Sequence, residues 1–217
     1  MTHGRHRLLI TAVLTAALVT GCQSGTGGGA TPLSLRGLTE TADGMPDGGA
    51  STCPLTYDVA QAAKATGLDE ATGPGPVQDD GDPVATAEGG KRAEPGEPLA
   101  ENPGALVSCT FHIGKDDVQV HTVATRKPQA IAALAPVVQR LAGASMDDLS
   151  RYMKLAGDAK AGDVVVTDSG NVAAVRLKLD GDGDAYLLVG FGEAGTSAPD
   201  RRQQVADLAG TLADQVR

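Results

Sequence analysis

The chain has 217 residues, enough for one or two domains, and only 2% of them are aromatic, with no Trp. Its formal net charge is −9. Residues 1–21 contain two Arg and no acidic residue, so the rest of the chain carries −9 minus 2, or −11. A surface of that sign repels phosphate backbones and anionic headgroups, and so few aromatic rings offer little for base stacking. We therefore expect no nucleic-acid partner.

Residues 1–21 have the features of a bacterial signal peptide. Arg5 and Arg7 precede residues 8–19, an apolar stretch without a charge. This stretch is too short to cross about 30 Å of hydrocarbon, but it fits the apolar core of a signal peptide. Residues 19–22, Val-Thr-Gly-Cys, resemble the lipobox of bacterial lipoproteins, in which the Cys thiol receives a diacylglyceryl group before cleavage.

This pattern predicts that Cys22 is lipidated and that the chain is anchored on the extracytoplasmic face of the cell membrane. Two acyl chains hold a protein far more firmly than one, because each buried CH₂ contributes about 0.8 kcal/mol. The alternative is an ordinary secreted protein in which Cys22 occupies this position by chance.

Two segments after the anchor lack the periodicity of a folded element. Residues 22–50 are rich in Gly, Thr, Ser and Asp, which predicts a flexible tether. Residues 70–104 contain Gly-Pro-Gly-Pro and scattered acids, which predicts a disordered acidic insertion. We expect the remainder of residues 51–217 to form a single domain.

The first patterned segments of this domain are a helix and a β-hairpin. The helix is expected over residues 56–66, with Thr56 as its N-cap and Gly67 as its stop. The hairpin is expected over residues 108–125, with residues 114–117 as its loop, so that Cys109 would pair with Thr122.

Helices and strands then alternate in blocks. A helical segment over 128–142 should be kinked or split by Pro136, and Ser145 should cap a helix to about Leu155. Residues 163–192 predict a three-strand meander, and a final helix capped by Ser197 should bury four apolar side chains: Val205, Leu208, Leu212 and Val216. The fold class is therefore α+β, with an antiparallel sheet, made of a hairpin and a three-strand meander, backed by helices in an α/β/α sandwich-like arrangement.

Cys53 and Cys109 remain after lipidation of Cys22, and an even pair outside the cell usually forms a disulfide. The two residues are 56 positions apart. A disulfide over this separation should stabilise the folded state by about 4 kcal/mol, because it lowers the entropy of the unfolded chain. Two free thiols and a metal-binding pair are the alternatives, although no CxxC motif supports a metal.

Three motifs suggest ligand chemistry, and each has a simpler interpretation. Residues 190–195 match GxGxxG, but no helix opens within the glycines, so a strand exit turn is preferred to a dinucleotide site. Residues 180–184, Asp-Gly-Asp-Gly-Asp, start like a calcium loop without its later Gly and Glu, so a polar hairpin turn is preferred. His112 and His121 share one face of the predicted hairpin, diagonally placed, where two ligands make a poor zinc site.

We therefore expect no catalytic residue, no metal and no cofactor. No Gly-x-Ser-x-Gly, Ser-x-x-Lys or His-Glu-x-x-His motif occurs in the sequence.

From Cys53 onward the chain resembles a family of small actinobacterial secreted lipoproteins of unknown function. The resemblance is carried by Cys53-Pro-Leu-Thr before a short helix, Cys109-Thr-Phe at a hairpin, Leu-Ala-Gly-Asp-Ala at 155–159 and Gly-Asn at 170–171. The family usually has an aromatic residue near the second Cys, often Trp, where this chain has Phe111; residues 70–104 depart from the pattern. The resemblance implies an antiparallel sheet backed by helices, similar to the photosystem-accessory and Ran-binding α/β/α sandwiches, and it supplies no catalytic residue.

Three functions are compatible with these features. The first is a non-enzymatic accessory module that binds an envelope protein or a small ligand while anchored to the membrane through Cys22. The second is a solute or signal sensor with a pocket between sheet and helices. The third is a hydrolase of unfamiliar type, which needs two or three titratable groups that converge in a cleft.

Overall fold

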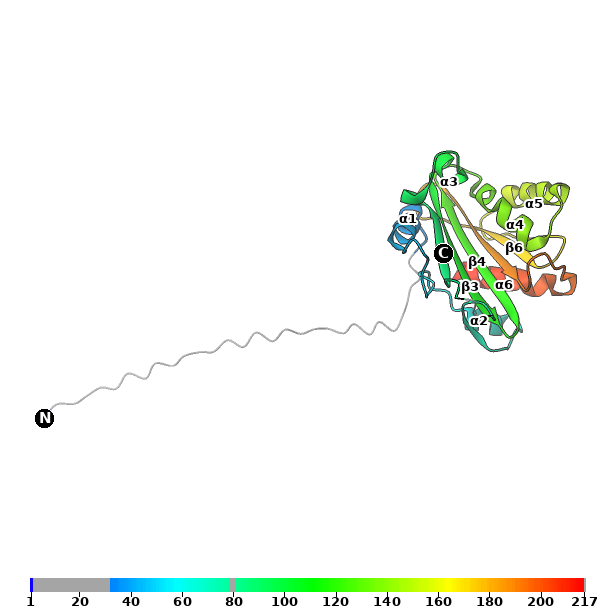
Figure 1. Ribbon diagram of the computed structural model, residues 1–217, viewed down its shortest axis with the longest axis horizontal. Coiled ribbons are helices and arrows are strands. Elements are labelled where there is room, and N and C mark those ends of the chain that lie inside the picture. Colours follow the sequence, from blue (N-terminus) through cyan, green and yellow to red (C-terminus); the bar gives the residue numbers. More distant parts are fainter. Residues whose placement is uncertain (2–31, 79–80, 217) are drawn as a thin grey trace.

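The computed structural model describes Met1, residues 32–78 and residues 81–216, so Cys22 and almost all of the expected signal peptide lie outside the described residues (Figure 1). The α-helices of this part are α1 (Leu35–Gly44), α2 (Val59–Ala65), α3 (Pro98–Glu101), α4 (Ala135–Ala142), α5 (Met146–Asp158) and α6 (Arg202–Asp214). The strands are β1 (Thr72–Pro74), β2 (Ala85–Gly89), β3 (Gly104–Ile113), β4 (Asp116–Thr125), β5 (Val164–Val166), β6 (Val172–Leu177) and β7 (Asp184–Phe191). Short 3-10 helices occur at η1 (Gly90–Arg92), η2 (Ala130–Leu134) and η3 (Pro199–Arg201).

The strands form one antiparallel sheet in the order β1-β3-β4-β7-β6-β5, and β2 also pairs with β3. The expected hairpin is β3–β4, and the expected meander is β5–β6–β7. The predicted α+β class and antiparallel sheet are therefore confirmed.

Helices cover both faces of the sheet, and each face has its own apolar core. In Figure 1, α1 lies on the other side of β3 and β4 from α4 and α5. Helices α1, α2 and α6 pack on the face that bears Cys109, Val120 and Leu187. Segment η2 with α4 and α5 packs on the opposite face against Val123 and Leu188. Strands β6 and β7 are buried on both faces, so the sheet has no solvated side there.

Helix α1 corrects the prediction of a flexible tether over residues 22–50 for the part that the structure describes, residues 32–50. Ser34 caps its N-terminus by accepting a hydrogen bond from the Gly37 backbone N–H at 3.0 Å. Leu38 and Ala42 are buried one turn apart, and Met45 follows at helical spacing. Few apolar side chains are present, but they lie on one stripe, so a segment rich in small residues folds onto the sheet.

The acidic segment 70–104 is also ordered where it is described, which corrects the prediction of a disordered insertion. It contributes β1 and β2, two short strands along β3, and α3. Pairing explains this order, because backbone hydrogen bonds to β3 do not require apolar side chains. The domain therefore includes the described residues 32–50 and the described part of this segment.

The β3–β4 hairpin has a tighter turn than expected. Gly114 and Lys115 alone form the turn, so Ile113 pairs with Asp116 and Cys109 with Val120. Residues 114–117 were predicted as the loop, and the pairing is therefore displaced by two residues. A two-residue displacement keeps every side chain on its predicted face, because the side-chain period of a strand is two.

Helix boundaries show which cap predictions were right. Asp58, and not Thr56, caps α2 by accepting from the Gln61 backbone N–H at 2.8 Å. Ser145 caps α5 as predicted, and the segment with Pro136 is split into η2 and α4. Ser197 does not cap the last helix, because η3 precedes α6. The four predicted apolar residues of that helix are buried: Val205, Leu208, Leu212 and Val216.

Candidate functional site

A cavity of about 500 Å³ lies at one end of the sheet, between α1, the start of β3, the end of β4 and the β6–β7 turn. Its volume is within the range of small-molecule sites. Its wall consists of Ser34, Leu35, Arg36, Thr39, Glu40, Gly90, Leu99, Pro103, Gly104, Arg126, Asp180 and Asp182. We call this cavity the α1 pocket.

The N-terminal segment is fastened to the sheet at the edge of the α1 pocket. The backbone N–H of Asp180 donates to the carbonyl of Leu33 at 2.8 Å. Leu33 and Leu38 are buried, whereas Leu35 and Thr39 of α1 line the cavity. The first turns of α1 therefore form one wall of the pocket.

A second part of the wall comes from the segment 70–104, which was predicted to be disordered. Pro98 begins α3, which buries Leu99, and Pro103 precedes β3. Gly104 opens β3, and a Cβ at this position would lie 2.2 Å from the carbonyl oxygen of Ala124. Only glycine lets the two strands approach there, so the wall is set by a backbone contact.

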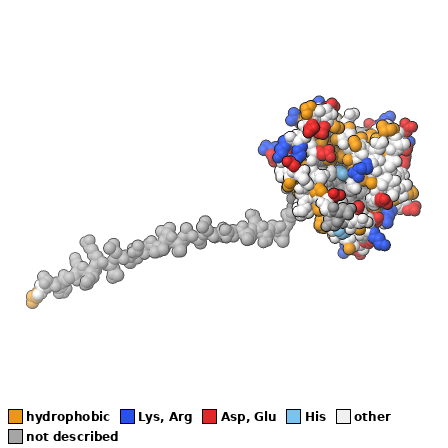
Figure 2. Space-filling view, viewed as in Figure 1, with side chains coloured by type: hydrophobic (Ala, Val, Ile, Leu, Met, Phe, Trp, Pro, Cys, Tyr) orange, Lys and Arg blue, Asp and Glu red, His pale blue; other side chains and the backbone are white. Residues whose placement is uncertain are grey.

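The pocket rim carries charges of both signs. Arg36 donates to Glu40 at 2.7 Å, and this carboxylate raises the pKa of Arg36, but both side chains are exposed, so the pair adds little stability. The side chains of Arg126, Asp180 and Asp182 have no hydrogen bond or ion pair within the described ranges. Figure 2 shows basic and acidic side chains next to each other over α1. A ligand would thus meet a free guanidinium and two free carboxylates.

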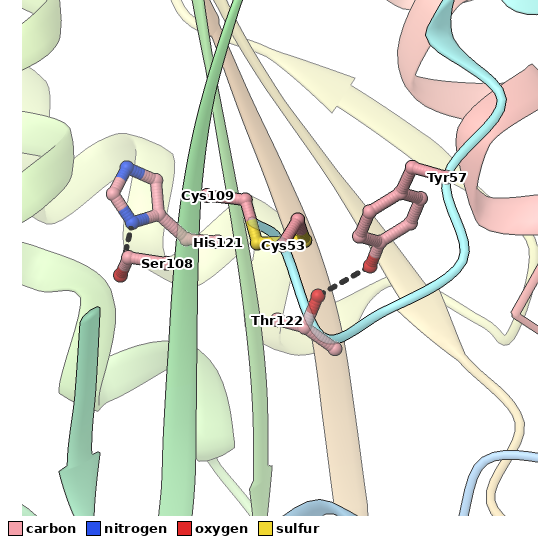
Figure 3. Close-up of a disulfide and its surroundings, with 6 residues drawn as sticks. All are labelled: Cys53, Tyr57, Ser108, Cys109, His121 and Thr122. Atoms are coloured by element: carbon pink, nitrogen blue, oxygen red, sulfur yellow. Dashed lines mark hydrogen bonds between the residues drawn. A yellow bond between two sulfur atoms is a disulfide. The ribbon is translucent and has the colours of Figure 1, made fainter. Parts of the chain in front are cut away.

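Cys53 and Cys109 form the predicted disulfide, with their Cα atoms 5.5 Å apart. Cys109 is buried in β3, and Cys53 reaches it from the loop before α2 (Figure 3). Nearby, the Tyr57 hydroxyl meets the Thr122 hydroxyl at 2.5 Å, and burial raises the pKa of Tyr57. The disulfide and this hydrogen bond fasten the same loop to β3 and β4, so they have a structural role.

His112 and His121 do not come together, which corrects the expectation that they lie diagonally close. His112 pairs with Asp117, and His121 pairs with Ser108 four residues further along β3. Four residues of strand separate the two positions by about 14 Å. Among the described residues, no group of three or more His, Cys, Asp or Glu is arranged to hold a metal ion.

His121 is buried in the second core, whereas His112 is half-buried and has its Nδ1 3.1 Å from the carbonyl of Gly75. The His121 Nδ1 lies 2.8 Å from the Ser108 hydroxyl (Figure 3), and its buried Nε2 has no partner in the described part of the chain. Burial, followed by the charge of Arg140, lowers the pKa of His121 to about 4. A serine nucleophile would need a third group to orient this imidazole, and the described residues place no hydrogen-bond partner at its second nitrogen.

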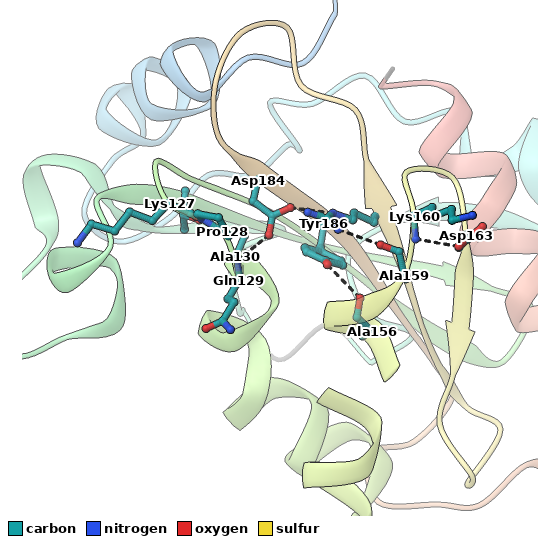
Figure 4. A network of polar contacts seen from close by, with 12 residues as sticks. Lys127, Pro128, Gln129, Ala130, Ala156, Ala159, Lys160, Asp163, Asp184 and Tyr186 are labelled. Atoms are coloured by element: carbon teal, nitrogen blue, oxygen red, sulfur yellow. Dashed lines mark hydrogen bonds and ion pairs between the residues drawn. The ribbon is translucent and has the colours of Figure 1, made fainter. Parts of the chain in front are cut away.

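The Asp-Gly-Asp-Gly-Asp turn does not gather its carboxylates. Asp184 points inward, where it accepts from the backbone N–H groups of Gln129 at 2.8 Å and Ala130 at 3.0 Å (Figure 4). It also pairs with Arg176 at 3.0 Å, while Asp182 is exposed. The third carboxylate of the supposed calcium loop is therefore committed to anchoring η2 on the sheet.

The GxGxxG segment ends β7 and turns away from it. Gly190 lies within β7, and Gly192 and Gly195 have φ of +80° and +79°. Helix α6 begins at Arg202, beyond these glycines, so their backbone N–H groups do not open a helix. This geometry agrees with the predicted exit turn.

The sequence analysis did not predict the α1 pocket, because most of its lining residues belong to the two segments predicted to be flexible or disordered, residues 22–50 and 70–104. A signal was present in the first segment: Ser34 is a preferred N-cap, and Leu38, Ala42 and Met45 follow at helical spacing. The sequence around Arg126 and Leu99 contains no comparable pattern, because its many turn-forming residues are equally typical of a loop.

The chain matches no protein-family model, no curated protein and no solved structure. The likeness to secreted actinobacterial lipoproteins therefore stays a prediction from short motifs. In the described part of the chain, no helix is long and apolar enough to cross a membrane.

Proposed function

We propose that the chain is an extracytoplasmic lipoprotein, anchored through Cys22, that binds a small ligand in the α1 pocket. The observation that carries this proposal is the cavity of about 500 Å³ whose rim holds Arg126, Asp180 and Asp182 without partners. Free charges next to an apolar wall are the combination that fixes the orientation of a bound small molecule.

In this proposal the protein is a binding module and not an enzyme. The wall contains no His, Cys or Tyr, and its three carboxylates, those of Glu40, Asp180 and Asp182, are exposed to solvent. The neutral His121 is enclosed in the second core, next to Ser108. A sensor with a pocket between sheet and helices, the second function considered above, is the same binding activity coupled to a downstream partner.

The anchor is tested by labelling cells with a fatty-acid analogue and analysing the N-terminal peptide by mass spectrometry. We expect lipid on Cys22 of the wild type, and a Cys22→Ser variant that is unlabelled and released from the membrane. An unmodified Cys22 in the mature chain would contradict the anchor.

The pocket is tested by purifying the membrane-anchored protein without denaturant and identifying the small molecules that accompany it. Thr39→Phe should fill the cavity from α1, so a ligand of the wild type should be absent from this variant. Thr41→Phe is the matched control, because Thr41 lies on the same helix but does not line the α1 pocket. Identical small-molecule content in all three proteins would contradict the proposed function.

A further inference from the structure

We propose that the α1 pocket binds the headgroup and glycerol region of a zwitterionic phospholipid with a primary amine, such as a phosphatidylethanolamine. This inference rests on the proposed function, since it requires both the anchor and the pocket. The class of ligand is identified by the charges and the hydrogen-bonding groups that line the pocket.

The position of the pocket relative to the anchor supports a membrane ligand. Leu33, at the edge of the pocket, follows Cys22 by eleven residues. Even a fully extended chain of that length reaches only roughly 40 Å, and a flexible one spans about half of that. A chain anchored through Cys22 therefore holds the pocket close to the lipid headgroups.

The charges of the pocket match a zwitterion. Arg126 can donate two parallel hydrogen bonds to a phosphate, which is the geometry a guanidinium favours. Asp180 and Asp182, which line the same cavity, can accept hydrogen bonds from an ammonium group. Leu35, Leu99 and Pro103 provide the apolar surface for the glycerol and the first methylene groups.

The same chemistry argues against the other common headgroups. A choline group donates no hydrogen bond and is recognised by aromatic cages, and no aromatic side chain is among the lining residues that the structure describes. An anionic headgroup without an amine would leave both aspartates unpaired, and the chain after residue 21 carries a net charge of −11, which repels it.

The test uses the chain from residue 22 onward with Cys22→Ser, which contains all the helices and strands of the described domain. The probes are dihexanoyl phosphatidylethanolamine, phosphatidylcholine and phosphatidylglycerol, each titrated below its micelle concentration and followed by NMR. We expect the amine lipid to bind about tenfold more tightly than the other two, because charge-assisted hydrogen bonds to the ammonium group are lost with choline or glycerol.

The variants separate the two ends of the headgroup. Asp180→Asn with Asp182→Asn should abolish the preference for the amine lipid, whereas Arg126→Gln should weaken the binding of all three lipids. Lys127→Gln is the matched control for Arg126, because Lys127 is the next residue and lies outside the α1 pocket. All these side chains are exposed, and thermal melting by circular dichroism verifies that each variant is folded.

Equal affinity for the amine and choline lipids, or no binding of any of them, would overturn this inference. The proposed function would survive that result if a different small molecule accompanied the wild type and was absent from Thr39→Phe. If no small molecule distinguished those proteins either, both proposals would fail.

Discussion

The imidazole Nδ1 of His121 on β4 lies 2.8 Å from the hydroxyl of Ser108, its pairing partner on β3. Helices α4 and α5 cover this face of the sheet, and the second imidazole nitrogen is buried without a partner among the described residues. This arrangement keeps the histidine neutral, because a buried imidazolium without a carboxylate is strongly disfavoured.

The pH dependence of stability should report this burial. The pKa of His121 is about 4 in the folded chain and about 6.5 in the unfolded chain, so only the unfolded state gains its proton between those values. The contribution is fully present above about pH 6.5 and is lost as the pH falls to about 4, which amounts to roughly 3 kcal/mol. Urea unfolding at a series of pH values measures it.

The matched variants are His121→Asn, which can keep the bond to Ser108 without titrating, and His112→Asn, which retains His121. The first should lose this part of the pH dependence and the second should retain it. The same pH profile for wild type and His121→Asn would show that the imidazole is not the source.

Truncating Leu38 tests whether α1 belongs to the folded domain. Leu38 is 1% exposed, so Leu38→Ala should lower the free energy of unfolding by about 2–5 kcal/mol. Arg36→Ala, on the exposed side of the same helix, should change it by less than about 0.5 kcal/mol. Urea denaturation measures the free energy of unfolding of both variants. An unchanged value for Leu38→Ala would contradict the packing of α1 and favour the flexible tether.

Removal of the disulfide should destabilise the chain through its unfolded state. Cys53→Ala with Cys109→Ala should lose about 4 kcal/mol, because the link closes a loop between positions 56 residues apart. Cys22→Ser leaves the link intact and should match the wild type in the same unfolding assay. Full alkylation of Cys53 and Cys109 in exported protein without reductant would refute the pairing.

Asp182 in the β6–β7 turn and Asp184 at the start of β7 should differ strongly in the stability lost on truncation. Asp184→Ala removes the acceptor of two backbone N–H groups and the partner of Arg176, which should cost about 2–3 kcal/mol. Asp182→Ala, on the exposed part of the turn, should cost less than about 0.5 kcal/mol. Chemical denaturation measures both, and equal losses would mean that the buried network contributes nothing specific.

The sequence alone was sufficient for those features that depend on local patterns. The Ser145 cap follows from a local capping motif. The faces of β3 and β4 and the apolar stripe of α6 follow from a period of 2 or 3.6 residues, which leaves one way to bury the apolar side. The Cys53–Cys109 pairing followed from the number of cysteines. The predicted β3–β4 pairing was wrong by two residues, but each side chain still lies on its predicted face, because side chains alternate between the faces with a period of two.

Only the tertiary structure decided which weakly patterned segments are ordered and where the pocket lies. Residues 32–45, 70–78 and 81–104 contain few large apolar side chains, so their order depends on backbone pairing with β3 and on close packing against a sheet formed by distant residues. The charges of Arg126, Asp180 and Asp182 are ordinary surface charges in the sequence. They surround one cavity because antiparallel pairing brings the end of β4 and the β6–β7 turn to the same end of the sheet, a long-range relation that no local period encodes.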